Sequence, residues 1–275
     1  MRNDRMNIYS GGEKMEKIAV LSDIHGNLEA LKSCLEDIDQ RGIQRIICLG
    51  DVIAKGVHPI ECLDLLIKRN AIILRGNCDR YFSETHEKVD ERINFNQQMI
   101  NETYRDFLYH LPMSYECYIS GALIRFVHAT PTADNAYVGS ASSSEDEWKM
   151  YLPSLHTSDQ IADIVVYGHT HTPYLNKAYH HTLINVGSVG NSIDLYQDEK
   201  HPGNHQLTAM AYYMVIEGNL HKEEIGPLSF NHIQVPYDIE KELSSAKFNP
   251  EKEAYEKELR FGLYRDIKYL RAVKK

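Results

Sequence analysis

The stretch KIAVLSDIHGN, residues 17–27, shows which kind of fold this chain adopts. It starts as a short apolar run, KIAVL, and ends in a polar turn. The residues after it repeat apolar side chains at spacings of three and four, at Leu28, Leu31, Leu35 and Ile38. A short apolar run followed by this spacing predicts a buried strand that leads into an amphipathic helix.

Two more apolar runs of this kind follow. RIICLG at 45–50 comes before Asp51 and a second helical pattern through Ile60–Ile67. AIIL at 71–74 is followed by the polar turn RGNCD. Strand and helix in alternation predict βαβ units and a largely parallel sheet, hence an α/β fold.

Further strands are expected around 115–119, 123–129 and 162–168. YLNKAY, HTLINVG and MAYYMVIEG are expected to be strands of a second sheet, and no Gly or Pro interrupts 80–111 before Pro112, which favours a helical insert over about 80–112. We expect residues 1–14 to be a disordered lead-in or a remnant of expression. Residues 15–218 would form the main domain, and 219–275 a C-terminal strand plus helical extension packed on it.

Composition narrows the function classes. The formal net charge of −9 over 275 residues argues against a general nucleic-acid or anionic-membrane surface. It leaves a phosphorylated substrate open, because bound cations would set the local field. No stretch is long enough to span a bilayer. Five cysteines without a CxxC pair suggest reduced thiols and a cytoplasmic setting.

Polar motifs follow the predicted strands: Asp23-Ile24-His25-Gly26-Asn27, Gly50-Asp51, Gly76-Asn77-Cys78-Asp79, His128, and Gly168-His169-Thr170-His171. Ligands bind at this edge of open α/β sheets. Alone, Asp-x-His or Gly-Asp is more often a turn, and a single His is more often an ordinary core or surface residue. All five in this order favour a metal site. Oxygen donors mixed with imidazoles suit Mn²⁺, Fe, Zn²⁺, Co²⁺ or Ni²⁺.

With these motifs the sequence resembles the calcineurin-like metallophosphoesterase family over roughly residues 16–190. GNCD at 76–79 is similar to the small phosphodiesterase branch. The greater length, HATP at 128–131 and NVGSVG at 185–190 are similar to a longer bacterial branch related to diadenosine polyphosphate hydrolases. The resemblance implies a four-layer αββα sandwich of two mixed sheets flanked by helices.

The resemblance also implies a metal-dependent hydrolase with two divalent ions, Mn²⁺ foremost. Asp23, His25 and His171 would hold one ion, and Asn77, His128 and His169 the other, with Asp51 bridging them. A hydroxide between the ions would attack a phosphodiester or phosphoanhydride, with nucleotide substrates favoured. Asp51, Asn77 and His128 are the candidate catalytic residues, with Asp79 and Cys78 as further candidates. Alternatives are a protein phosphatase or phosphomonoesterase, or a catalytically silent metal-binding scaffold.

One position departs from the family pattern: many relatives have a histidine where this chain has Cys78. The thiol is either a weak proton donor or a packing residue, and the role of Asp79 is open in consequence. Asn27 is either a phosphate-contacting residue or a helix N-cap. Arg80 could clamp phosphate or form a surface ion pair. The C-terminal extension could also build a homodimer.

Overall fold

The computed structural model describes residues 15–178, 180–193 and 209–263, and within them ten strands form two five-stranded sheets. The first sheet has the order β10-β9-β1-β2-β3, with bounds β1 Glu16–Leu21, β2 Arg45–Cys48, β3 Ile72–Ile73, β9 Ala211–Gly218 and β10 Leu228–Val235. The second has the order β4-β5-β6-β8-β7, with bounds β4 Ser114–Ile119, β5 Ala122–Val127, β6 Ile164–Tyr167, β7 Tyr174–Ala178 and β8 His181–Asn185. Both sheets mix parallel and antiparallel pairs.

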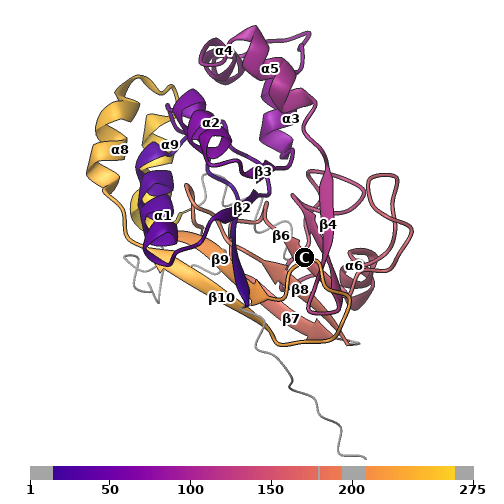
Figure 1. Ribbon diagram of the computed structural model, residues 1–275. Coiled ribbons are helices and arrows are strands. Elements are labelled where there is room, and N and C mark those ends of the chain that lie inside the picture. Colours follow the sequence, from indigo (N-terminus) through magenta and orange to yellow (C-terminus); the bar gives the residue numbers. More distant parts are fainter. Residues whose placement is uncertain (1–14, 179, 194–208, 264–275) are drawn as a thin grey trace, which may run out of the picture.

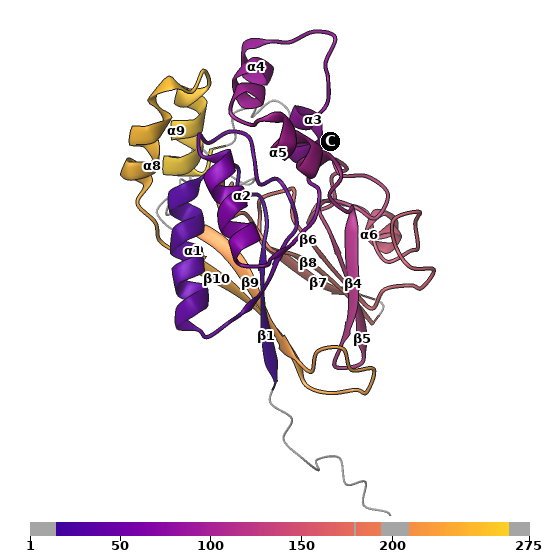
Figure 2. The same cartoon turned by 45° about the horizontal axis from the view of Figure 1, so that its top comes forward.

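Helices flank the two sheets (Figure 1). Their bounds are α1 Leu28–Gln40, α2 Pro59–Lys68, α3 Asn77–Ser83, α4 Glu91–Gln98, α5 Glu102–Tyr109, α6 Ser144–Lys149, α8 Ile239–Ser245 and α9 Lys252–Phe261, with a short 3-10 turn at Ala246–Phe248. In both cartoon views α8 and α9 lie beside α1, and α6 lies on the other side of the molecule, by the second sheet (Figure 2). The predicted four-layer αββα sandwich is confirmed.

Alternation along β1 explains the layering. Ile18 and Val20 point into the core between the two sheets, where they meet Phe126 of β5 and Val166 of β6. Ala19 and Leu21 point the other way, into the core beneath the helices. Because successive side chains of a strand face opposite sides, a stretch buried on both faces is apolar throughout, as IAVL at 18–21 is.

One strand belongs to a different sheet from the one expected. MAYYMVIEG contains β9, which pairs antiparallel with β1 in the first sheet, with Ala19 opposite Val215. The prediction that it joins the second sheet is wrong, whereas β7 and β8 do lie there. The apolar pattern of β9 identifies a buried strand, but either sheet offers such a strand two apolar faces.

The strand order brings the polar loops to one edge. β1 and β2 are parallel neighbours in the first sheet, and β5, β6 and β8 are parallel neighbours in the second. The carboxyl ends of parallel strands share an edge, so the loops that follow them meet there. No helix in the described parts of the chain has both the length and the apolarity to cross a bilayer.

Candidate metal centre

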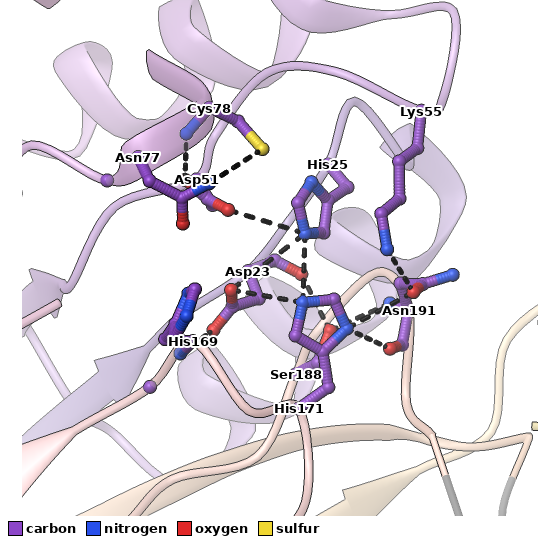
Figure 3. A network of polar contacts seen from close by, with 12 residues as sticks. Asp23, His25, Asp51, Lys55, Asn77, Cys78, His169, His171, Ser188 and Asn191 are labelled. Atoms are coloured by element: carbon purple, nitrogen blue, oxygen red, sulfur yellow. Dashed lines mark hydrogen bonds and ion pairs between the residues drawn. The ribbon is translucent and has the colours of Figure 1, made fainter. Parts of the chain in front are cut away.

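Four loops at this edge and the start of α3 supply the predicted ligands. Asp23 and His25 follow β1, and Asp51 follows β2. Asn77 is the first residue of α3, and His128 follows β5. His169 and His171 follow β6. Figure 3 shows most of these side chains directed toward one another.

Three histidines are held in the same way. The Nδ1 atom of His25 lies 3.2 Å from the Ile53 carbonyl oxygen, that of His128 lies 3.1 Å from Leu49 O, and that of His171 lies 2.6 Å from Asn191 O. A carbonyl oxygen can only accept, so each Nδ1 carries the proton and donates. Each Nε2 therefore presents a lone pair to the centre, the tautomer that a metal ligand needs.

Two of these lone pairs, those of His25 and His171, point at an Asp23 oxygen that accepts no hydrogen bond from any described residue. The Nε2 atoms of His25 and His171 are 3.1 Å apart, and they lie 3.8 and 3.2 Å from Asp23 Oδ1. Asp23 is fully buried, and Oδ1 has no donor within hydrogen-bond reach. Two facing lone pairs and a buried carboxylate oxygen without a donor are costly unless a cation lies between them, so this group fits a metal ion.

Asp51 links this group to a second one. Its Oδ2 lies 3.7 Å from His25 Nε2, and its Oδ1 lies 3.5 Å from His128 Nε2. Asn77 Oδ1 is 3.1 Å from the same His128 Nε2. Among the His, Cys, Asp and Glu residues that the structure describes, ligand atoms within 4.8 Å of one another occur in three sets: Asp23 with His25 and His171, Asp23 with Asp51 and His128, and His25 with Asp51 and Cys78.

His169 lies beside these sets without joining any of them. Its ring packs edge-on against His128 with the centroids 5.2 Å apart, and its backbone N–H donates to Asp23 Oδ2 at 2.9 Å. Burial, and after it the charge of His128, lowers the pKa of His169 to about 3. A neutral imidazole is the form that ligates metals.

The backbone of the site is strained. Five of the predicted ligands have positive φ, between 52° and 64°: Asp23, His25, Asp51, His169 and His171. Residues other than glycine adopt this left-handed region at a cost, and such residues cluster at functional sites. The sequence keeps a ligating side chain at these turns although glycine would fit the backbone better.

Burial and mutual charge set the protonation of the site. Burial alone would raise the pKa of Asp23, but the surrounding imidazoles, that of His171 first, hold that pKa well below its usual range. Burial, and then the charges of Lys55 and His171, lower the pKa of His25. Burial lowers the pKa of His128, but nearby carboxylates, Asp51 first, raise it above its ordinary value.

The Asp79 carboxylate lies under the Asp51 loop. Its Oδ2 accepts from the N–H groups of Asp51 and Gly76, and its Oδ1 accepts from those of Val52 and Ile53. Burial and the charge of Asp51 raise the pKa of Asp79 to about 7, against these donors. A Cβ at position 76 would overlap the Asp51 side chain, so glycine is required there.

The other predicted residues lie around this centre. Asn27 is fully buried, accepts from Ala30 N at 3.0 Å as the N-cap of α1, and donates to Gly190 O at 2.9 Å. Arg80 forms an ion pair with Asp134 at 2.6 Å and another with Glu84. In this structure Asn27 is the N-cap of α1, and Arg80 forms ion pairs.

Cys78 donates its backbone N–H to Asp51 Oδ1 at 2.8 Å. Burial, followed by the charge of Asp51, raises the pKa of its thiol, so the sulfur carries its proton at neutral pH.

A further loop completes the site, and the metal-ligand motifs did not point to it. Ser188 Oγ donates to the Asp23 carbonyl at 2.7 Å, and Gly190 N donates to the same oxygen at 3.0 Å. Asn191 holds His171. The available signal was NVGSVG after a predicted strand, whose small residues allow this close approach: a Cβ at Gly190 would overlap the Ile24 carbonyl.

Comparison with known proteins also points to a phosphoesterase. Residues 16–208 match the calcineurin-like phosphoesterase superfamily domain. The chain belongs to this superfamily. It is also 31% identical, over 82% of its length and 89% of the relative's, to an uncharacterized protein of Methanocaldococcus jannaschii.

Two solved structures share the fold. A metallophosphoesterase from Sphaerobacter thermophilus superposes with a TM-score of 0.67 at 19% identity, over 91% of this chain and all of that one. A hypothetical protein from Pyrococcus horikoshii superposes with a TM-score of 0.71 at 18% identity, with the same coverage. The predicted family is thus confirmed. It is a family of metal-dependent phosphoesterases, and in this chain the groups around Asp23 and Asp51 are the candidate ligands.

Proposed function

We propose that this calcineurin-like phosphoesterase hydrolyses a phosphodiester or phosphoanhydride, with nucleotide substrates favoured, and that it works with two divalent cations. One observation carries the proposal: the two oxygens of Asp51 face two different histidines, His25 and His128. A carboxylate so placed suits a bridge between two ions, which lie about 3.5–4 Å apart in two-metal sites.

The ligands divide on either side of that bridge. Asp23, His25 and His171 would hold one ion, and their mutual distances support this grouping. Asn77, His128 and His169 would hold the other, supported by the contact of Asn77 with His128 and by the packing of His169 on the same ring. Oxygen and imidazole donors without a thiolate cage favour Mn²⁺ among the candidate ions.

When bound, divalent cations lower the pKa of a water molecule and stabilise charge on phosphoryl oxygens. The residues of the chain supply the remaining requirements. Backbone carbonyls hold each Nε2 toward the centre, and Asp79 fixes the loop that carries Asp51. No side chain has to form a covalent phospho-intermediate.

Cys78 bears on the choice of substrate. Its thiol stands at the start of α3 beside Asp51, and a thiol with a raised pKa is a poor proton donor. A leaving group that departs without strong acid assistance would therefore be favoured. A nucleotide or phosphate group, with a second pKa of about 6, meets this condition.

The test is a substrate panel with Mn²⁺: bis-p-nitrophenyl phosphate, diadenosine tetraphosphate, p-nitrophenyl phosphate, an alkyl phosphomonoester and a phosphopeptide. We expect the first two to be hydrolysed fastest and an Asp51→Asn variant to be inactive on both. Equal rates on the alkyl monoester would contradict the substrate preference. Bound metal with no turnover of any substrate would favour a silent scaffold.

A further inference from the structure

Helix α9 lies beyond the matched domain of residues 16–208, yet it places a buried carboxylate next to the metal centre. Glu258 is fully buried, and its Oε2 accepts from Asn191 Nδ2 at 3.0 Å. The same oxygen lies 3.9 Å from Lys55 Nζ. A buried carboxylate is stable in the protein only when it is paired in this way.

Asn191 connects Glu258 to the candidate ligand His171. Its side-chain Oδ1 accepts from Lys55 Nζ at 2.6 Å and lies 3.1 Å from His171 Nδ1, and its backbone oxygen lies 2.6 Å from that nitrogen. Figure 3 shows Lys55 and His171 both directed at Asn191. With both amide atoms bonded and no exposed surface, Asn191 cannot turn without breaking a bond to one of these residues.

Glu258 also balances charge behind the centre. Lys55 is a cation bonded to the amide that also lies against His171, so it would repel a metal ion held there. The Glu258 carboxylate bonds to Asn191 Nδ2 and lies 3.9 Å from Lys55 Nζ, where it offsets that charge. Removing its charge would weaken this balance and the hold on Asn191 Nδ2.

We propose that Glu258 is a positioning residue of the metal centre: through Asn191 it fixes the His171 imidazole, and with Lys55 it keeps the local charge neutral. The C-terminal helix α9 is thus part of the site rather than a cover on the domain. The inference rests on the proposed function, because it takes the group around Asp23 to be a metal site.

The test compares two buried glutamates of the C-terminal helices in the full chain. Glu258→Gln removes the charge at the site, and Glu242→Gln is the matched control. Glu242 is equally buried but bonds to Tyr255 Oη and Glu29 N, away from the ligands. Mn²⁺ affinity is measured by calorimetry, and the absorption spectrum of the Co²⁺-loaded protein reports ligand geometry.

We expect Glu258→Gln to bind one ion about 10–100-fold more weakly, the usual effect of losing a residue that supports a ligand, and to alter the Co²⁺ spectrum. Glu242→Gln should bind Mn²⁺ as the wild type does. Asn191→Ala cuts the same link from its other side and keeps the backbone oxygen on His171. It should weaken binding similarly, and the double variant should be little weaker than either single one.

Wild-type Mn²⁺ affinity in both Glu258→Gln and Asn191→Ala, or equal weakening in Glu242→Gln, would overturn this inference and leave the proposed function standing. Absence of metal binding by the wild type would overturn the proposed function, and this inference with it.

Discussion

At the scale of single residues, Asp79 shows how a side chain can serve the chemistry without taking part in it. Its two oxygens accept from four backbone N–H groups that belong to the Asp51 loop and to Gly76. In an Asp79→Asn variant the amide nitrogen would take the place of one of these oxygens. It would face backbone N–H groups, which are donors as well.

We therefore expect Asp79→Asn to lower the free energy of unfolding by about 1–3 kcal/mol, the cost of buried unsatisfied donors, and to reduce hydrolysis by displacing Asp51. Urea denaturation checks the stability, and Asp159→Asn, at an exposed position, serves as the control. A variant of unchanged stability whose pH–rate profile has lost one limb would instead identify Asp79 as a proton-transferring group.

The ion pair between Arg80 and Asp134 makes a pH-dependent contribution. Burial alone would raise the pKa of Asp134, but hydrogen bonding to Arg80 and its charge lower that pKa below the ordinary 3.8. A carboxyl group with a lowered folded-state pKa adds stability above its ordinary pKa, and this stability is lost as the pH falls through the lowered value.

Asp134→Asn should therefore cost about 1–3 kcal/mol near pH 7, and the difference from the wild type should shrink as the pH falls below 3.8. Unfolding by urea at a series of pH values measures this. Glu84→Gln, at the more exposed partner of Arg80, should show a smaller difference. A difference that is constant with pH, or that grows in acid, would show that the ion pair does not act in this way.

At the scale of elements, the N-terminus of α1 is fastened at two points. Asn27 caps the helix through Ala30 N and also binds Gly190 in the loop that holds the Asp23 backbone. Asn101 caps α5 in the same manner, through Tyr104 N, but it is exposed.

We expect Asn27→Ala to lower the unfolding free energy by about 1–3 kcal/mol, because it loses a cap and a buried bond, and Asn101→Ala to lower it less. Thermal unfolding of both variants gives the comparison. If Asn27→Ala kept its stability but lost affinity for substrate, Asn27 would contact phosphate and not serve mainly as the cap.

The elements also show what a sequence can and cannot predict. β1, α1, β2 and α2 follow from local periodicity, because a strand or an amphipathic helix shows its own pattern of burial. The partner of β9 does not, because pairing with β1 joins residues about 200 positions apart and both sheets provide apolar surroundings. Periodicity identifies the kind of element, whereas its neighbours depend on the topology of the whole chain.

The candidate site follows the same division. Its ligand-type residues could be predicted because Asp, Asn and His recur at the ends of strands, where side chains from distant loops meet. Lys55, Asn191 and Glu258 could not be, because each is a single polar residue without ligand spacing. The fold brings them together: Asn191 accepts from Lys55 and donates to Glu258 of α9.

At the scale of the whole molecule, metal binding should stabilise the fold, because the ligands come from both sheets. Mn²⁺ at about 100 times its dissociation constant should add about 2.7 kcal/mol to the free energy of unfolding, seen as a higher melting temperature. A chelator should reverse the gain. The same titration on Asp51→Asn is the control and should show a smaller shift; an unchanged melting temperature in the wild type would speak against a metal ion held between the sheets.

In the proposed function, side chains from distant loops hold two cations with Asp51 between them. Anomalous diffraction from crystals grown with Mn²⁺ would locate these ions. We predict two peaks about 3.5–4 Å apart, one beside Asp23, His25 and His171 and one beside Asn77 and His128, each next to an oxygen of Asp51. No peak at this edge of the sheets, or a single peak out of reach of Asp51, would contradict the account.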